Sequence, residues 1–186
     1  LAVTRSSTDV HGWYAIEVDG KILCDSNVTP PTVPTVATTV RANPSAGFSI
    51  ATYTGDGSAS ASIAHGLNAA PEMFIVKSRS DAYDWFVYHH ALGNGTLTRL
   101  NTYGTSGSTG YWANKTPTSN EIFLDGNVNT EVAGSGKTFV CYSFTGVEGY
   151  SKFGSYTGNG SADGPFVYTG FRPAFILFKN SQGSNS

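Results

Sequence analysis

The chain has 186 residues, of which 39% are hydrophobic and 13% aromatic, so it can bury a substantial core. Charged residues make up 13% and the net charge is −2, whereas a nucleic-acid-binding surface needs clustered basic residues. A membrane-spanning helix needs a run of about 18 apolar residues, and the sequence contains no such run. We therefore expect no nucleic-acid partner, no membrane insertion, and the Ser-, Thr-, Asn- and Gly-rich surface that is typical of extracellular and virion proteins.

The first segment, residues 1–24, predicts a terminal β-hairpin. Apolar and polar residues alternate from Trp13 to Val18, Asp19-Gly20 is a two-residue turn signal, and residues 21–24 return as a second strand. We expect this hairpin to close a preceding unit or to dock on the rest of the chain.

The second segment, residues 25–46, has the composition of a linker. It carries Pro30, Pro31, Pro34 and Pro44 among Thr, Val and Ser residues. Proline removes a backbone donor and favours extended, polyproline-like backbone. The sequence therefore predicts a Pro/Thr-rich linker between the hairpin and the remainder of the chain.

The rest of the chain contains an internal repeat. SIATYTGDG at 49–57 matches KFGSYTGNG at 152–160, and PEMFIVK at 71–77 matches PAFILFK at 173–179. Between these blocks, HGL at 65–67 matches TGF at 169–171. A repeat of about 100 residues has the size of one β-sandwich domain. We expect a complete β-sandwich repeat at 47–148 and a partial second repeat at 149–186, with 49–77 and 152–179 superposing as the same strand-turn-strand unit.

Short β-rich runs separated by Gly, Asn and Asp turns fill both copies, and no window shows a sustained helical period. The fold class predicted is all-β, with sandwich or jelly-roll-like repeat units and very little helix. The expected strands are 47–54, 59–64, 72–78, 83–89, 97–103, 121–124, 137–146, 150–156, 164–168 and 173–179.

Residues 133–138, AGSGKT, end like a phosphate-binding loop, but two features of that motif are missing. Glu131 stands where the motif needs its first glycine, and an apolar, strand-like run from Phe139 takes the place of a helix. We interpret this stretch as a Gly-rich hairpin turn and expect no nucleotide and no other cofactor.

The residues that could bind a metal or form a disulfide are few. Cys24 and Cys141 each lie in an apolar run and are predicted to be buried free thiols, with a disulfide bridge as the alternative. His89 and His90 would point to opposite faces of one strand. We therefore expect no metal site within one chain, although symmetry-related copies could pool one histidine each.

No motif of a catalytic nucleophile is present, and we expect no enzyme activity and no catalytic residue. The carboxylates are sparse and stand mostly in turn contexts. A glycosidase needs two converging carboxylates, and distant strands can bring such a pair together. A surface-polysaccharide depolymerase therefore remains an alternative.

Two aromatic clusters are the candidate ligand-binding residues. Sugars are recognised by stacking on exposed Trp or Tyr rings, with a few polar groups for the hydroxyls. Trp112 comes after a Gly/Ser/Thr-rich loop, and strand alternation places Trp85, Val87 and His89 on one face. The alternative is that the side chains on both faces of this strand are packed inside the sandwich, so that Trp85 and Tyr88 are core residues. The candidate glycan-binding residues are Trp85, Tyr88, His89, Tyr111, Trp112 and Asn114.

The sequence resembles a repeat module of virion proteins from marine tailed phages. The stretches that carry the likeness are YTGDG, HGL, EMFIVK and DWFVYH, then W-NKTPTSNEIFL and VEGYSKFGSYTGNG. The segment GWYAIEVDGKIL resembles the end of a lectin-like β domain that often precedes such repeats.

The resemblance implies a tail fibre or related appendage, located on the virion, that contacts host-surface glycans. It also implies contacts with other virion proteins and a homotrimer. Uncovered strand edges favour self-association as well, and a filament formed by a non-closing contact is the alternative to the trimer. The alternative is a capsid-decorating or filament-forming structural subunit without a ligand.

Overall fold

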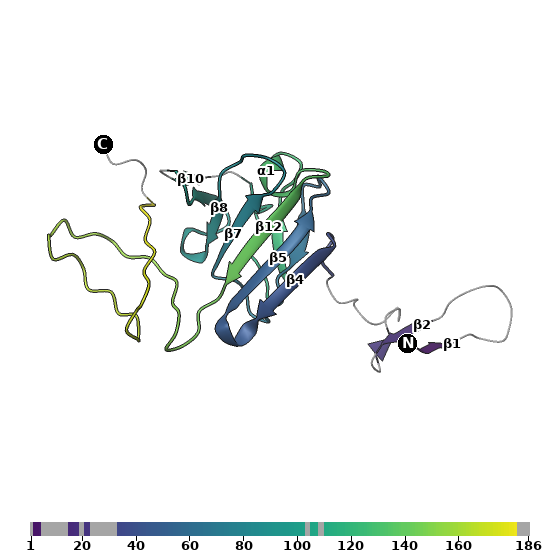
Figure 1. Ribbon diagram of the computed structural model, residues 1–186, viewed down its shortest axis with the longest axis horizontal. Helices are drawn as coiled ribbons and strands as arrows, with labels where there is room; N and C mark the ends of the chain where they lie inside the picture. Colours follow the sequence, from purple (N-terminus) through teal and green to yellow (C-terminus); the bar gives the residue numbers. More distant parts are fainter. Residues whose placement is uncertain are drawn as a thin grey trace. The chain divides into compact units, whose positions relative to one another are not determined.

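The computed structural model describes residues 33–102, 105–107 and 110–181, together with strand residues 2–4, 15–18 and 21–22. The chain divides into two units, Leu1–Val33 and Pro34–Ser186 (Figure 1). Each unit has β-sheet structure of its own.

The N-terminal unit contains a small antiparallel sheet. Its strands are β1 (Ala2–Thr4), β2 (Ala15–Val18) and β3 (Lys21–Ile22), in the order β1-β2-β3. Val18 pairs with Lys21, so β2 and β3 are antiparallel neighbours within the stretch where the hairpin is expected. The turn residues Asp19-Gly20 and Cys24 lie outside the described residues.

The second unit is built on an antiparallel seven-stranded sheet in the order β10-β9-β8-β7-β12-β5-β4 (Figure 1). A two-stranded sheet, β11-β6, forms a second layer. The strands of the large sheet are β4 (Thr38–Asn43), β5 (Phe48–Thr54), β7 (Met73–Ser78), β8 (Phe86–His89), β9 (Thr96–Arg99), β10 (Thr105–Gly107) and β12 (Thr138–Phe144). Those of the small sheet are β6 (Ala61–Ala64) and β11 (Glu121–Leu124).

Helical structure in the described residues is limited to single turns. These are the 3₁₀ turns η1 (Pro44–Ala46) and η2 (His90–Leu92) and the short helix α1 (Thr130–Ala133). The expected all-β class is therefore confirmed. None of the helices described has the length and apolar character needed to cross a membrane.

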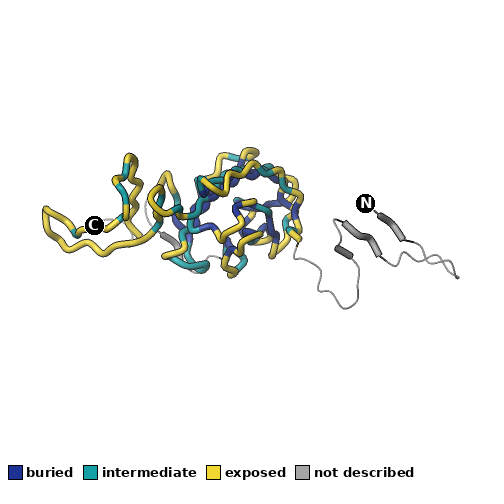
Figure 2. Tube along the Cα trace, turned by 90° about the horizontal axis from the view of Figure 1, so that it is seen from below, coloured by how far each residue is buried: buried dark blue, intermediate teal, exposed yellow. Residues whose placement is uncertain are grey.

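The core of this β module, residues 34–144, lies between the two sheets. Along β5 and β12 buried residues alternate with half-buried ones, as expected for strands with one face toward a core. Phe74 and Phe139 of the large sheet share one buried cluster with Ile63 and Ile122 of the small sheet. The burial pattern in Figure 2 shows this core inside the module.

Strand β12 is the last of the described strands in sequence order but lies in the interior of the large sheet, between β7 and β5. It pairs with β5 along one edge and with β7 along the other, so that Cys141 lies opposite both Ala51 and Val76. Cys141 is a fully buried free thiol, as predicted for it. The strands β5 and β7 are thus held together only when β12 stands between them.

Part of the predicted linker is a strand. Residues 38–43 form β4, which pairs with β5, and Val36 is buried in the core. The four prolines flank this stretch and do not interrupt it, and β4 is an edge strand, where one row of backbone donors needs no partner. The prolines led us to expect the module to begin at residue 47, whereas its first strand, β4, already begins at Thr38.

The expected superposition of 152–179 on 49–77 is wrong. The described residues after Phe144 contain no strand, only an isolated bridge between Val147 and Ser151. Residues 150–181, called here the C-terminal segment, are mostly exposed (Figure 2). The physical reason is that the counterparts of β5 and β7 need a strand of the β12 type between them, and the described part of the segment offers none.

Candidate functional site

Three of the predicted glycan-binding residues are core residues. Trp112 is fully buried, with 0% of its surface exposed, and Tyr88 and Tyr111 are also buried. The ring of Phe74 stacks on Tyr88 at 4.7 Å and meets the edge of Trp112 at 4.8 Å between centroids. These side chains hold the two sheets together and offer no ring face to a ligand.

The position of Trp112 is explained by the backbone of its loop. Gly110, Ala113 and Asn114 all have positive φ values, and the N–H of Ala113 donates to the carbonyl of Gly110. This tight turn directs the indole into the core, where its Nε1–H donates to the carbonyl of Thr96 at 3.0 Å. The expectation that a residue after a Gly-rich loop would be exposed was therefore wrong.

The remaining candidates do not form one cluster. Asn114 is exposed, and its carbonyl accepts a hydrogen bond from the Asn94 side chain at 3.1 Å. His89 lies opposite Met73 at the end of β8 and is half-buried. Trp85 directly precedes β8 and is also half-buried. The structure brings none of these three together with the buried Trp112.

Trp85 instead pairs with Tyr142, a residue that the sequence reasoning did not select. The two rings stack with centroids 6.4 Å apart and planes 19° apart. Tyr142 alternates along β12 with the buried Cys141 and Ser143, so its side chain lies on the opposite side of the sheet from the core. Because side chains alternate between the two faces of a strand, the sequence of residues 138–144 could have indicated that Tyr142 lies on the face away from the core.

We call this side of the large sheet the outer face. Its residues are those that alternate with the core positions of β5, β12 and β7, and they are mostly apolar. They include Phe48, Ile50, Met73, Ile75, Val140, Tyr142 and Phe144. Most are half-buried, whereas Ile75 and its neighbour Val87 on β8 are buried.

A polar network fixes the backbone of Trp85 at the border of the outer face. Its N–H donates to Asn101 Oδ1 at 3.0 Å, and the Asn101 amide donates to Asp84 Oδ1 at 2.8 Å. The Arg99 guanidinium pairs with the other oxygen of Asp84 at 3.1 Å. The aromatic pair thus has amide, carboxylate and guanidinium groups beside it.

The two adjacent histidines do not point to opposite faces. Their ring centroids lie 5.0 Å apart, because the strand ends at His89 and η2 begins at His90. The N–H of Ala91 donates to His89 Nδ1 at 3.2 Å, and burial, with a smaller effect of His90, lowers the pKa of His89. Within the described residues, no group of three or more His, Cys, Asp or Glu side chains could hold a metal ion.

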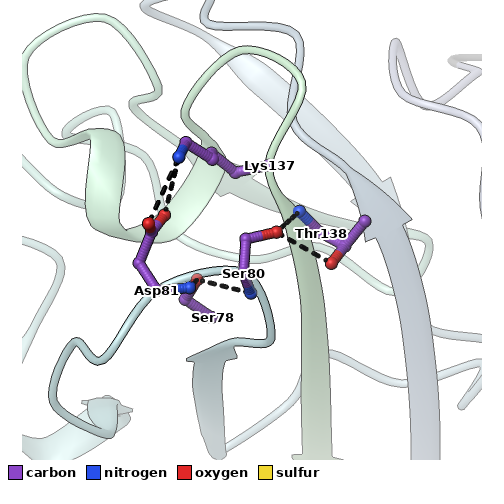
Figure 3. A network of polar contacts seen from close by, with 5 residues as sticks. All are labelled: Ser78, Ser80, Asp81, Lys137 and Thr138. Atoms are coloured by element: carbon purple, nitrogen blue, oxygen red, sulfur yellow. Dashed lines mark hydrogen bonds and ion pairs between the residues drawn. The ribbon is translucent and has the colours of Figure 1, made fainter.

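The loop that resembles a phosphate-binding motif is tied to the neighbouring loop by side chains (Figure 3). The Lys137 ammonium pairs with both oxygens of Asp81, at 3.2 and 3.1 Å. The Thr138 N–H donates to Ser80 Oγ at 2.9 Å, and β12 begins at Thr138. Lys137 is therefore paired with a carboxylate and directly precedes a strand. The loop joins the short helix α1 to β12, so the expectation of a hairpin turn was wrong.

A shallow cleft of about 440 Å³ lies where the end of the module meets the C-terminal segment. Glu72 and Glu148 line it together with Lys152, whose ammonium donates to the carbonyl of Tyr168 at 2.9 Å. The same ammonium lies 5.5 Å from the centre of the Tyr168 ring. Sequence reasoning missed this cleft because its residues come from distant parts of the chain.

A family model described as a domain of unknown function, DUF7483, matches residues 25–186. The chain belongs to the DUF7483 family. No curated protein and no solved structure matches it. The DUF7483 match includes β4, the outer face, the cleft and the C-terminal segment, and it begins after β3 of the N-terminal unit.

Proposed function

We propose that this DUF7483 chain is a structural component of a phage virion, a tail fibre or similar appendage, and that the outer face of its large sheet contacts host-surface glycans. The low charged fraction of the chain supports this role, because it implies a Ser-, Thr-, Asn- and Gly-rich surface of the kind typical of extracellular and virion proteins. The resemblance to virion proteins of marine tailed phages points in the same direction.

The observation that carries the glycan contact is the stacked pair of Trp85 and Tyr142 on the outer face. A sugar presents an apolar ring face and a rim of hydroxyls, so an accessible aromatic ring and nearby hydrogen-bonding groups suit it. Trp85 is half-buried, and Asp84 and Asn101 beside it carry the carboxylate and amide groups that sugar hydroxyls bind. We therefore assign the proposed glycan contact to Trp85 and Tyr142 on the outer face and not to the buried Trp112.

The test is binding of the fluorescently labelled chain to an array of bacterial capsular polysaccharides and O-antigens, and to a panel of marine bacterial isolates. We expect Trp85→Ala and Tyr142→Ala each to reduce binding about tenfold, which corresponds to a loss of about 1.4 kcal/mol. Both side chains are half-buried, so the thermal midpoint should fall only modestly.

Tyr83→Ala is the matched control, since Tyr83 is an exposed aromatic residue outside the stacked pair. It should leave binding unchanged. Equal binding by the unmodified chain, Trp85→Ala and Tyr142→Ala would contradict the glycan contact.

The edge strand β4 favours the second candidate, a filament-forming or capsid-decorating subunit. β4 ends the large sheet, and four of its six residues are exposed. An edge strand offers unpaired backbone groups to a second copy. The mass from light scattering should then exceed that of a monomer at micromolar concentration, and Thr39→Lys should lower it. A monomer under these conditions would contradict self-association.

A further inference from the structure

The stacked rings of Trp85 and Tyr142 meet across strand β7. This strand lies between β12, which carries Tyr142, and β8, which begins directly after Trp85 (Figure 1). Ile75 of β7 lies opposite Tyr142 on one side and opposite Val87 on the other. It belongs to the outer face but is only 8% exposed, because neighbouring side chains cover it. The aromatic pair therefore has a fixed place on the face, relative to which its charged neighbours can be located.

The charged side chains at the outward positions of the large sheet are basic. Residues that lie opposite each other on paired strands share a face, so the register identifies these positions. Arg41 lies opposite Ile50, which lies opposite Tyr142, and Lys77 lies opposite Val140. No Asp or Glu occupies an outward position on β4, β5, β12, β7 or β8. With one Arg, one Lys and neutral histidine, the formal charge of these positions is +2, opposite in sign to the −2 of the whole chain.

The carboxylates beside this face already have basic partners. Asp84 pairs with Arg99 at 3.1 Å, and Asp81 pairs with Lys137 at 3.1 Å. Within the described residues, neither of the two outward cations forms an ion pair. Their charges are therefore not neutralised by the module itself.

Lys77 lies next to the aromatic pair. The register of β7 and β8 pairs Val76 with Phe86, so that Trp85, one position earlier, lies opposite Lys77. The Lys77 ammonium donates to the backbone carbonyl of Tyr83. An ammonium has three donors, and a neutral carbonyl removes none of its charge. Lys77 thus keeps a positive charge and further donors beside the indole ring.

Arg41 supplies a second positive charge across β5. It is exposed, lies on the edge strand β4 and shares a row with Tyr142. The two positions are two strand spacings apart, which is about 10 Å. A guanidinium can bind a carboxylate through two parallel hydrogen bonds. A polymer that lies across the strands would therefore meet aromatic rings and two positive charges on one face.

We infer that the outer face binds an acidic polysaccharide: a sugar ring stacks on Trp85 and Tyr142, and uronic acid carboxylates pair with Lys77 and Arg41. This inference rests on the proposed function and adds the charge of the ligand to it. A neutral glycan gains the stacking contact but no ion pair. The two cations thus select among glycans, whereas the rings bind acidic and neutral glycans alike.

The test uses the array of capsular polysaccharides and O-antigens, with each member that contains uronic acid printed beside its carboxyl-reduced, neutral form. Two exposed ion pairs should make the acidic forms bind about tenfold more tightly at about 0.05 M salt, and this preference should shrink at about 0.5 M salt because of screening. Equal or tighter binding of the reduced forms would overturn the inference and leave the glycan contact standing. Binding to no member of the array would overturn both.

Three variants separate the charge from the stacking contact. Lys77→Gln and Arg41→Gln should each lower the preference for the acidic forms about threefold. Trp85→Ala should weaken binding to the acidic and the reduced forms by the same factor, because stacking does not depend on the charge of the ligand. A preference for the acidic forms that is unchanged in both Gln variants would overturn the inference.

Two controls test whether the position of the charge and the sugar itself matter. Lys115→Gln removes the same charge from the other layer, where the Lys115 ammonium lies 5.1 Å from the centre of the Phe123 ring. It should leave the preference unchanged, and a loss equal to that of Lys77→Gln would contradict the inference. Poly-L-glutamate carries carboxylates without sugar rings and should bind at least about tenfold more weakly than the acidic polysaccharides. Equal binding of poly-L-glutamate would show that charge alone is sufficient and would also overturn the inference.

Discussion

At the scale of single residues, several buried polar side chains are satisfied by backbone groups far away in the sequence. The Tyr53 hydroxyl donates to the carbonyl of Val132 at 2.5 Å, and the Trp112 indole donates to the carbonyl of Thr96 at 3.0 Å. A buried polar group without a partner costs free energy, so each of these bonds favours one arrangement of the loops around the core.

Trp112→Ala should lower the free energy of unfolding by about 3–5 kcal/mol, the usual loss for a fully buried aromatic residue. The lost contacts include the edge contact with Phe74 and the bond to Thr96. Urea denaturation followed by circular dichroism measures the change. The exposed Tyr83→Ala should change the same quantity by less than about 0.5 kcal/mol. Similar values for both variants would contradict the core position of Trp112.

His65 makes the module sensitive to acid. It is fully buried, its Nδ1 accepts from the Leu67 N–H at 3.2 Å, and its Nε2 lies 3.1 Å from the carbonyl of Thr118. This arrangement fits a neutral ring with its proton on Nε2. A second proton on Nδ1 would face the N–H of Leu67. Burial lowers the pKa of His65, although the Thr118 carbonyl opposes this in part.

The sign of the pH effect is set by this lowered pKa. The unfolded chain takes up the proton near the ordinary pKa of about 6.5, whereas the folded chain does so only at lower pH. The contribution of neutral His65 to the free energy of unfolding is therefore fully present above about pH 6.5. As the pH decreases from there to the folded pKa, this contribution is lost, with a limiting slope of about 1.4 kcal/mol per pH unit. Urea denaturation at a series of pH values measures it.

His65→Gln should flatten this pH dependence, even though the variant is less stable at neutral pH. A residual slope is expected from His89, whose pKa is lowered in the same direction. An unchanged slope in His65→Gln would show that His65 is not the source.

At the scale of elements, the α1–β12 loop locks β5 in place. The Gly55 N–H donates to the carbonyl of Lys137, and the Gly136 N–H donates back to the carbonyl of Gly55. The close approach of Ala133 to Gly55 leaves no space for a side chain. The glycine of the YTG motif is therefore required by tertiary packing.

Gly55→Ala should lower the free energy of unfolding by about 1–3 kcal/mol, the range for forcing an extra carbon into a packed site. Gly158→Ala is the matched control at the same position of the motif in the second copy. It should be nearly neutral, since nothing lies within 4 Å of the added carbon. Thermal or urea denaturation distinguishes the two, and equal losses would contradict the packing difference between the copies.

Most strands of the module could be predicted from local patterns. β5, β7, β11 and β12 lie within expected ranges because alternation and Gly-containing turns mark them. β4 was missed because nearby prolines dominate its composition, yet its pairing with β5 depends only on the backbone. Of the stacked pair, the sequence predicted Trp85 as a site residue but not Tyr142. Tyr142 is 57 residues away in sequence, and only the order of the strands in the sheet brings it close to Trp85.

At the scale of the whole molecule, the C-terminal segment is held to the module by few contacts. Phe153 meets Phe144 at 6.1 Å between ring centroids, and its carbonyl lies 3.3 Å from His90 Nε2. Lys179 donates to the carbonyl of Thr102. Segments with little burial open locally at low cost in free energy.

Chymotrypsin should therefore cleave the C-terminal segment before it cleaves the β module. Tyr156, Phe166 and Phe178 are exposed cleavage positions, whereas Phe74 and Phe139 are buried in the module. Mass spectrometry should show early products that end between Tyr150 and Phe178, and the thermal midpoint of the trimmed protein should stay within a few degrees of the original. Early cleavage after Phe74 or Phe139, or a large fall of the midpoint, would contradict this division.

The sequence by itself determined the all-β class, the positions of most strands and the repeated turns, because alternation and turn residues act over a few neighbouring positions. The tertiary structure decided which aromatic residues are accessible, since a turn with positive φ values takes Trp112 into the core while strand order leaves Trp85 beside Tyr142. It also decided the state of the second copy. Residues 49–77 and 152–179 share a pattern, but among the described residues only the first stretch pairs with β12. Strand pairing is a contact between distant residues that no local pattern can supply.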